Sequence, residues 1–279
     1  KQKTAYDILR CRVGSEMCIR DRHCHTRYSD GSTPLEELIQ LAALRGVTTF
    51  ALTDHDTMAG CECALELGRE AGVTVIPGVE ISAADPKRHG KAHILCYKPK
   101  KPEVLLPLLQ KTTDSRHAAM LRSVDKVCRL YAVPREMILR RAEGSTNIYK
   151  QHVLQALMDA GYANEMFGEV FKKLYDSKTG IAYEKVDYPD IDTVMDAVDA
   201  AEGIAVLAHP SEYHSMDLLR ELCRNHRIRG IEVYHPRNTE EDKAEMLRLA
   251  EKYDLAVTGG TDYHLSLIHI SEPTRHLRI

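Results

Sequence analysis

Two histidines spaced by one residue, His23 and His25, are the first residues of this chain that could do chemistry, and Asp30 follows five residues after them. Side chains at positions i and i+2 point to the same side of an extended strand, so both imidazoles would face one way. Imidazole and carboxylate groups that converge at a strand end are suitable ligands for Zn, Mn or Fe. Taken alone, the pattern also fits a surface strand that carries its histidines by chance.

Similar groups recur at the ends of later apolar runs. His55 lies between Asp54 and Asp56 directly after residues 47–53, and Glu80 lies near the end of residues 73–81. The chain then offers further groups in the same kind of position, namely His93, His209, His235, Asp262 and His264. About nine nitrogen and oxygen ligands exceed the three or four protein ligands that one zinc ion usually takes. The pattern therefore predicts a centre of two or three metal ions, which is suited to phosphoryl transfer to water.

Strands and helices alternate in the stretches that would hold these groups. Apolar runs predict strands at residues 23–25, 47–53, 73–81, 92–97, 204–208, 230–234 and 255–259. Helices are expected from Pro34 to Gly46 and at residues 58–71, 192–201, 216–225 and 240–253. Thr33 and Glu36 form a capping box for the first of these helices, and Thr239 caps the last.

This alternation predicts an α/β fold with a parallel sheet and right-handed crossovers. The strand count leaves open a closed or distorted barrel and an open doubly wound sheet. Functional groups collect at the carboxyl ends of the strands in both architectures, and around the full ring only in a barrel.

Residues 99–185 interrupt the alternation with successive amphipathic helices, expected at residues 114–131, 135–142, 149–160 and 163–175. We therefore expect a barrel domain formed by residues 23–98 and 186–264, with residues 99–185 as a helical insertion.

The segments VGSEMCIRDR and LSLIHISEPTR near the two ends resemble translated sequencing-adapter sequence. Residues 1–22 and 265–279 are accordingly predicted to be a non-native extension and a non-native tail.

Composition narrows the class of protein. A net charge of −3 over 279 residues does not indicate nucleic-acid binding driven by bulk positive charge. The eight cysteines show no CxxC spacing, which favours free thiols in the cytoplasm. No apolar run approaches the ~20 residues that span a bilayer, so no membrane association is expected, and nothing indicates an obligate protein partner.

The segments HCHTRYSDG, ALTDHDTMAG, IPGVEIS, HILCY, LAHP and GGTDYH occur in this order. Together they resemble the motifs of the PHP (polymerase and histidinol phosphatase) domain, and more closely its TrpH/YciV-like phosphoesterases. The resemblance covers residues 23–264. It implies a distorted (β/α)7 barrel with an inserted helical subdomain and a trinuclear metal site.

The resemblance also implies a ligand set for each ion. The first set is His23, His25, Glu80 and Asp262. The second is Glu80, His93 and His209, with Glu80 as the bridge, and the third is Asp30, His55 and His264. Manganese is the expected metal, with iron or zinc as alternatives. Asp54 and Asp56 would orient imidazoles or cap the next helix, and Cys24 would face away from the metals.

The activity implied is that of a metal-dependent phosphoesterase in which a metal-bound hydroxide attacks phosphorus. The expected substrates are small phosphorylated nucleotides, such as a 3′,5′-bisphosphate, or the 5′ ends of short RNA. Candidates for holding the substrate are Lys150, His152, Arg27 and His235. Two alternatives stay open, a phosphatase of a non-nucleotide monoester such as histidinol phosphate and a non-catalytic module that binds metal for stability.

Overall fold

The computed structural model describes residues 20–264, so residues 1–19 of the predicted extension and the whole predicted tail lie outside the described residues. Within this range a sheet of seven strands follows the order of the chain. The strands are β1 (Arg20–Cys24), β2 (Thr49–Leu52), β3 (Thr74–Asp85), β4 (Gly90–Tyr97), β5 (Ile204–Leu207), β6 (Gly230–Tyr234) and β7 (Ala256–Gly259).

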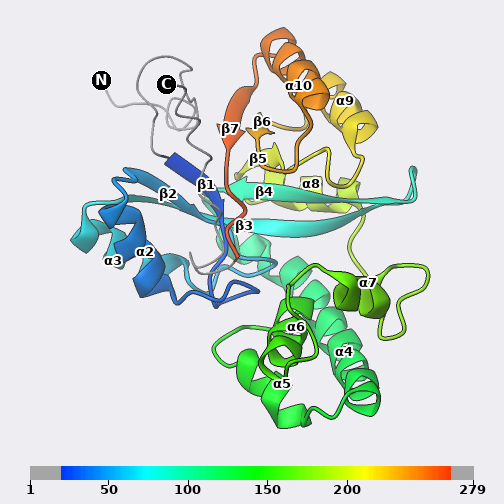
Figure 1. Cartoon of the computed structure of the whole chain (residues 1–279). Helices are drawn as coiled ribbons and strands as arrows, with labels where there is room; N and C mark the ends of the chain where they lie inside the picture. The colour runs from blue at the N-terminus through cyan, green and yellow to red at the C-terminus, as the bar shows by residue number, and fades with distance from the viewer. Residues whose placement is uncertain (1–19, 265–279) are drawn as a thin grey trace, which may run out of the picture.

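The sheet curls into a nearly closed, distorted barrel (Figure 1). β1 meets the segment after β7 through a parallel bridge between Cys24 and Tyr263. Two backbone hydrogen bonds close the same seam, from His25 N to the Tyr263 carbonyl (3.0 Å) and from Asp262 N to the His23 carbonyl (2.9 Å). The expected α/β class and distorted seven-stranded barrel are therefore confirmed.

One strand departs from the parallel arrangement that the sequence pattern predicted. β4 pairs antiparallel with both β3 and β5, whereas the other neighbouring strands are parallel. Only residues 86–89 separate β3 from β4, and a parallel connection needs a dozen or more residues. Because β4 runs in the opposite direction, its early residues, including His93, lie at the barrel end where the parallel strands finish.

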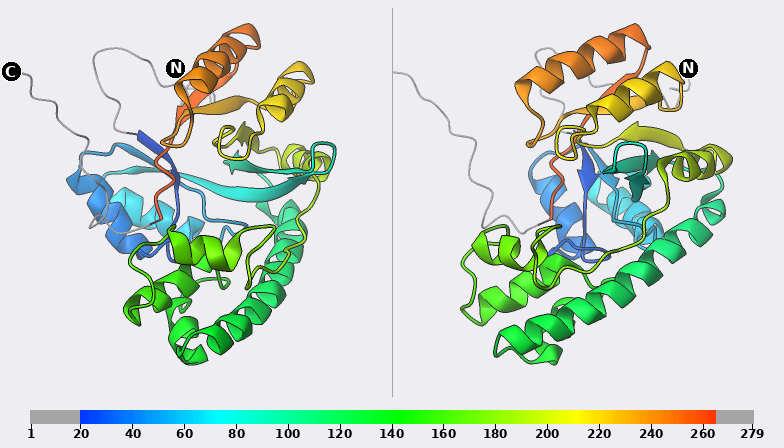
Figure 2. Two further views of the ribbon diagram at one scale, coloured as in Figure 1. Left: turned by 45° about the vertical axis from the view of Figure 1, so that its right-hand side comes forward. Right: turned by 90° about the vertical axis from the view of Figure 1, so that its right-hand side faces the viewer.

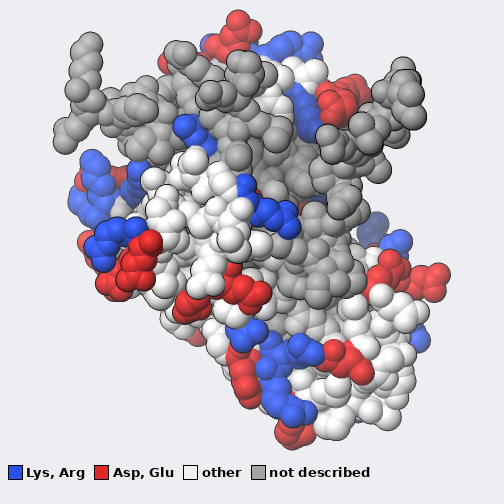
Figure 3. All heavy atoms as spheres, turned by 60° about the vertical axis from the view of Figure 1, so that its left-hand side comes forward, with Lys and Arg blue, Asp and Glu red and all other residues white. Residues whose placement is uncertain are grey.

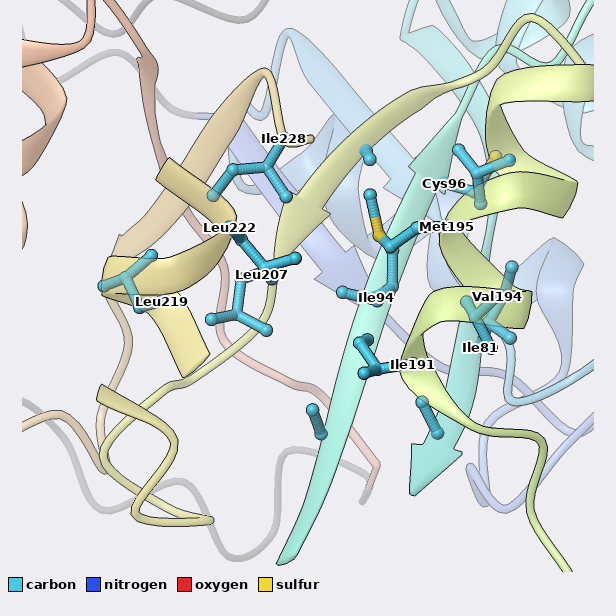
Figure 4. Close-up of a cluster of buried hydrophobic side chains, with 14 of the residues drawn as sticks. Ile81, Ile94, Cys96, Ile191, Val194, Met195, Leu207, Leu219, Leu222 and Ile228 are labelled. Atoms are coloured by element: carbon cyan, nitrogen blue, oxygen red, sulfur yellow. The ribbon is translucent and has the colours of Figure 1, made fainter. Parts of the chain in front are cut away.

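Helices cover the outside of the barrel (Figures 1 and 2). They are α2 (Leu35–Leu44), α3 (Cys61–Ala71), α8 (Ile191–Ala200), α9 (Met216–Arg224) and α10 (Glu240–Lys252). Figure 4 shows part of the core beneath them, where Ile191 and Met195 of α8 face Ile94 of β4 and Leu222 of α9 lies near Leu207 of β5. Burying each such side chain stabilises the fold by roughly 1.5–3 kcal/mol.

Of the two predicted helix caps, one is confirmed and the other is wrong. Thr239 caps α10, because its hydroxyl accepts a hydrogen bond from Asp242 N at 3.1 Å. The predicted capping box of Thr33 and Glu36 is wrong, since α2 begins without a side-chain cap. The Thr33 hydroxyl is buried and hydrogen-bonded to the Tyr263 hydroxyl at 3.0 Å, which helps to hold the seam of the barrel.

The segment between β4 and α8 forms a largely helical region at one end of the barrel, drawn in green in Figure 1. It contains a short 3-10 helix (Pro102–Val104) and α4 (Leu106–Leu130), α5 (Arg135–Arg141), α6 (Lys150–Asp159) and α7 (Glu169–Tyr175). Its buried apolar cluster includes Val124, Ile138, Leu154, Leu157 and Leu174. α4 begins earlier than predicted and α7 later. Within residues 20–264, no helix is long and apolar enough to cross a membrane.

β1 begins inside the segment that was expected to be an extension. Arg20 pairs with Thr49 of β2, and Arg22 is almost fully buried. The Asp21 carboxylate accepts hydrogen bonds from Thr261 N (3.0 Å) and the Thr261 hydroxyl (2.6 Å). Residues 20–22 thus contribute to the barrel and hold the strand that carries the first two histidines.

Candidate metal centre

The nine candidate ligands converge at the barrel end that faces the helical region. They come from six strands or from the loops directly after them. In chain order they are His23, His25, Asp30, His55, Glu80, His93, His209, Asp262 and His264. The structure brings all nine together, as the sequence analysis expected.

Four of their atoms lie close together and lack hydrogen-bond partners. Glu80 Oε2 is 3.1 Å from the Nε2 atoms of both His23 and His25, and Asp262 Oδ1 is 3.4 and 3.1 Å from the same nitrogens. All four atoms are buried and without a hydrogen bond among the described residues. Buried polar atoms are normally satisfied, because leaving them unpaired is costly. Two imidazole nitrogens and two carboxylate oxygens in this arrangement fit a divalent metal ion.

The second oxygen of Glu80 faces a different pair of imidazoles. Glu80 Oε1 lies 2.7 Å from His93 Nδ1 and 2.9 Å from His209 Nε2. Its side chain is completely buried in β3, which fixes both oxygens in place. A carboxylate with one group of imidazoles at each oxygen is well placed to bridge two ions.

A third group forms around Asp30. Its Oδ2 lies 3.2 Å from His264 Nε2 and 3.8 Å from His55 Nε2, and His25 also offers a ligand atom within 4.8 Å of the others. His55 has a second contact, because its Nδ1 is 3.0 Å from Glu80 Oε2. The three groups are therefore continuous, with His55 lying between the second and the third.

Opposite charges stabilise each other in this centre. Burial alone would raise the pKa of the Glu80 carboxyl, but the imidazoles of His23 and His55 hold that pKa well below its usual range. Burial would lower the pKa of His25, yet the Asp262 and Glu80 carboxylates raise it to about 10. The pKa of His55, in contrast, is lowered to about 3, chiefly by burial. The carboxylates require nearby positive charge, which divalent cations would supply.

Glu232 of β6 is a functional residue that the sequence analysis missed. It is completely buried, and its Oε1 lies 3.0 Å from His23 Nδ1, the nitrogen opposite the unpaired Nε2. Its Oε2 accepts a hydrogen bond from His209 N at 2.9 Å. A carboxylate on the far nitrogen of a metal-binding histidine fixes the ring and its tautomer. The available signal was a glutamate inside the apolar run GIEVY.

Asp54 and Asp56 support the centre without facing it. Asp54 accepts hydrogen bonds from Thr26 N (2.7 Å), the Thr26 hydroxyl (2.7 Å) and the Ser29 hydroxyl (2.6 Å), which shapes the loop between His25 and Asp30. Asp54 therefore holds this loop, whereas the sequence analysis expected it to orient an imidazole or to cap the next helix; α3 begins at Cys61 without a side-chain cap.

Asp56 is paired with a buried arginine from the helical region, Arg116, whose Nη2 donates to Asp56 Oδ2 at 2.6 Å and to the Ser82 hydroxyl at 3.1 Å. The guanidinium also lies over the Tyr149 ring, 4.9 Å from its centroid. Tyr149 in turn donates from its hydroxyl to the His55 carbonyl at 3.1 Å. The helical region is thus coupled to the ligand loops through a polar network that no sequence motif revealed.

The backbone is constrained where two ligands leave their strands. His209 and Asp262 have positive φ angles of 26° and 53°, a region that non-glycine residues seldom adopt. Such conformations persist at functional sites when the surroundings determine them. Gly260 is required nearby, because a Cβ at this position would lie 2.2 Å from the His23 Cβ.

A pocket of about 570 Å³ opens onto the centre, a volume typical of small-molecule sites. The ligands that line it are His55, Glu80, His93, His209, Asp262 and His264. The helical region contributes Lys150, Gln151, Phe167 and Phe171, and the barrel loops contribute residues that include Glu212, Tyr213 and Arg237. The pocket therefore lies between the barrel and the helical region, with the metal-ligand cluster in its wall.

Of the four predicted substrate-binding residues, Lys150 lines this pocket. Arg27 is exposed elsewhere and donates to the Ser32 carbonyl at 3.5 Å. His152 is buried, and its Nδ1 accepts a hydrogen bond from the backbone N–H of Tyr149 at 3.2 Å. His235 is also buried, with its Nε2 3.5 Å from Asp262 Oδ2, so it holds a ligand instead of facing the pocket. Arg27, His152 and His235 are not among the described residues that line the pocket.

The chain is similar to several known proteins. The family model described as the PHP domain matches residues 21–198. The chain is 39% identical to a phosphoribosyl 1,2-cyclic phosphate 1,2-diphosphodiesterase of Eggerthella lenta, over 88% of this chain and 94% of the relative. It is 29% identical to a 5′-3′ exoribonuclease of Haemophilus influenzae, covering 88% and 89%. It is 25% identical to a 3′,5′-nucleoside bisphosphate phosphatase of Chromobacterium violaceum, covering 88% and 86%.

A solved structure from Bifidobacterium adolescentis, described as a metal-dependent phosphoesterase, superposes on the chain with a TM-score of 0.79 at 29% identity. The match covers 88% of this chain and 87% of that one. The likeness extends over the barrel and the helical region, not over one motif.

Proposed function

This chain belongs to the PHP domain family, and we propose that it is a phosphoesterase that hydrolyses phosphate esters of nucleotides with the help of bound divalent metal ions. The observation that carries the proposal is the position of Glu80. Each of its two carboxylate oxygens lies within 3.1 Å of imidazole nitrogens from different strands, and four neighbouring buried atoms lack hydrogen bonds. This is the environment of a multinuclear metal site, and such sites suit phosphoryl transfer.

We assign two or three ions to this centre. The ligand sets that we propose are His23, His25, Glu80 and Asp262 for the first, Glu80, His93 and His209 for the second, and Asp30, His55 and His264 for the third. Manganese suits the mixture of imidazole and carboxylate, and iron or zinc would also fit. When bound, the ions lower the pKa of water and neutralise charge on the phosphate oxygens.

The chain's own residues hold this centre in place and shape the substrate pocket. Glu232 fixes the ring of His23, and Gln151 Nε2 donates to Asp30 Oδ2 at 2.6 Å. The Tyr213 ring lies 4.8 Å from His93, between centroids, and closes one side of the site. Fixed ligand geometry of this kind reduces the reorganisation that the reaction would otherwise require.

The substrates we propose are a 3′,5′-nucleotide bisphosphate or the 5′ ends of short oligoribonucleotides. The names of the relatives support this class, and they add phosphoribosyl 1,2-cyclic phosphate as a further candidate. Among the described residues on the face drawn in Figure 3, acidic and basic side chains are interspersed, and they form no continuous basic surface that would suit a long nucleic acid. The six described cysteines are free thiols, which supports our proposal of a cytoplasmic location.

A panel of substrates tests the proposal. Manganese-loaded protein is incubated with a nucleoside 3′,5′-bisphosphate, a short 5′-phosphorylated RNA, phosphoribosyl 1,2-cyclic phosphate and histidinol phosphate, and released phosphate or nucleotide is measured. We expect turnover of at least one of the first three. Turnover of histidinol phosphate alone would favour the non-nucleotide monoester alternative. If none of the four compounds is hydrolysed, the result would favour the other alternative, a non-catalytic module that binds metal for stability.

Lys150 is the residue that we propose to hold a substrate phosphate. Its Nζ lies 5.3, 5.4 and 6.0 Å from the ring centroids of Tyr175, Tyr183 and Phe171. Among residues 20–264, no carboxylate is recorded within ion-pair distance of this ammonium group. A positively charged group that is held by aromatic rings beside the metal centre, without an anionic partner of its own, is suited to binding an anionic substrate.

Replacing Lys150 with glutamine should raise KM about tenfold, the loss expected for one charge-assisted hydrogen bond. Burial, followed by the charges of Lys91 and Arg116, lowers the pKa of Lys150 to about 8. The ammonium is therefore charged below that pH and loses its proton above it, so KM of the wild type should rise as the pH passes about 8.

The measurement is KM between pH 6 and 10 for the wild type, Lys150→Gln and the exposed control Lys172→Gln. The rise in KM near pH 8 should disappear in Lys150→Gln and persist in Lys172→Gln. An equal rise in all three proteins would show that Lys150 does not bind the substrate.

A further inference from the structure

Arg237 lines the same pocket from the opposite, barrel side. It follows β6 in the loop His235-Pro236-Arg237, and its side chain is about half exposed. Its guanidinium forms an ion pair with Glu212, from the loop after β5. Arg237 is connected to the candidate metal centre through His235. Its backbone N–H donates to His235 Nδ1 at 3.2 Å, and His235 Nε2 lies 3.5 Å from Asp262 Oδ2.

Aromatic rings connect Arg237 to the helical region. The guanidinium lies over the ring of Phe167, 5.5 Å from its centroid. Phe167 is 45% exposed although it is a large apolar side chain, and its ring meets that of Phe171 edge to face at 5.2 Å. Lys150 contacts Phe171 in turn, with its Nζ 6.0 Å from the ring centroid. The pocket wall thus carries two cations at the ends of a pair of aromatic rings.

Glu212 occupies the space between Arg237 and the metal centre. One of its oxygens pairs with the guanidinium, and Oε2 lies 3.6 Å from His209 Nδ1, a buried nitrogen without a hydrogen bond. Glu212, His209 and Asp262 also offer ligand atoms within 4.8 Å of one another. The Glu212 carboxylate thus lies between the guanidinium and the candidate metal ligands, where an anion of the substrate could take its place.

We propose that Arg237 determines specificity by binding a second anionic group of the substrate, a phosphate, which competes with Glu212 for the guanidinium. The inference rests on the proposed phosphoesterase function, in which the metal centre takes the first phosphate. Guanidinium groups bind phosphate through two parallel N–H donors. The half-exposed position lets Arg237 exchange partners, and Phe167 supports the guanidinium during the exchange. The preferred substrates are therefore phosphate esters with a second phosphate, in preference to simple monoesters.

The two members of the ion pair should have opposite effects. Arg237→Gln should raise KM for adenosine 3′,5′-bisphosphate about tenfold, the loss expected for one charge-assisted contact, and change KM for adenosine 3′- and 5′-monophosphate less than twofold. Arg237→Lys should be intermediate, because it keeps the charge and loses the fork. Glu212→Gln should lower KM for the bisphosphate, because it removes the competing anion.

Melting temperatures and a matched variant control for structural damage. Arg135 is similarly exposed and paired with Asp125, and it does not line the pocket, so Arg135→Gln should leave all three KM values unchanged. If Arg237→Gln and Glu212→Gln shift KM in the same direction, or shift mono- and bisphosphates equally, the pair is only structural and the inference is wrong.

Failure of the proposed function can be distinguished from failure of the inference about Arg237. If the wild type hydrolyses none of the three nucleotides, the proposed function fails for this class, and dissociation constants of the same ligands, measured by calorimetry on metal-loaded protein, replace KM. The same opposite shifts are then expected, and their absence overturns the inference.

Discussion

Replacing Glu80 with alanine should abolish hydrolysis and remove more than one metal ion from each chain. The carboxylate faces the His23–His25 pair with one oxygen and the His93–His209 pair with the other, so one substitution disrupts two ion positions. Bound ions contribute several kcal/mol to transition-state stabilisation, so a loss in kcat/KM on the order of 1000-fold or more is expected. Activity and metal content, the latter by inductively coupled plasma mass spectrometry, should be measured on the same samples.

Glu245→Ala provides the matched control. Glu245 pairs with Arg220 on the outer helices at 2.7 Å, and it should keep full metal content and activity. If Glu80→Ala loses a single ion, or none, while remaining folded, the carboxylate does not bridge two ions.

Glu232→Gln should weaken metal binding although Glu232 lies behind the ligands. Its carboxylate contacts His23 Nδ1 with both oxygens, at 3.0 and 3.2 Å. Glutamine keeps the size of the side chain but loses its charge, so the imidazole becomes a weaker and less fixed ligand. Removal of such supporting carboxylates typically costs about 10–100-fold in metal affinity or activity.

This effect is measured as the dissociation constant for manganese, obtained by titrating manganese into protein from which a chelator has removed the metal. The exposed variant Glu240→Gln is the control. A lower melting temperature with an unchanged dissociation constant would give Glu232 a purely structural role and contradict the assignment.

The convergence of the candidate ligands could be predicted from the sequence because the information for it is local. A histidine or carboxylate at the end of an apolar run can be recognised from the sequence alone, and parallel strands must bring those ends to one side of a barrel. His93 was counted among these strand-end groups, but its place at this end depends on the antiparallel direction of β4. The short turn at residues 86–89 already predicts the antiparallel direction of β4, because it leaves no room for a crossover helix.

The supporting residues could not be predicted in the same way, because their partners are distant in the chain. Arg116 looks like a solvated helix residue until α4 places it against Asp56. Thr33 fits a capping box, yet burial beside Tyr263 gives its hydroxyl a tertiary partner instead. For Arg116 and Thr33 a contact across the fold decided between two roles that are equally compatible with the local sequence. His152 differs, because its partner is local: its Nδ1 accepts a hydrogen bond from the backbone N–H of Tyr149 at its own helix end.

Hydrolysis before and after removal of metal tests the central claim most directly. The protein is stripped with a chelator, its metal content is confirmed to be zero by mass spectrometry, and the rate with a nucleoside 3′,5′-bisphosphate is followed as manganese is restored. We predict no turnover without metal and a rate that rises as the buried imidazole–carboxylate groups around Glu80 are filled. Full turnover by the metal-free protein would contradict the account.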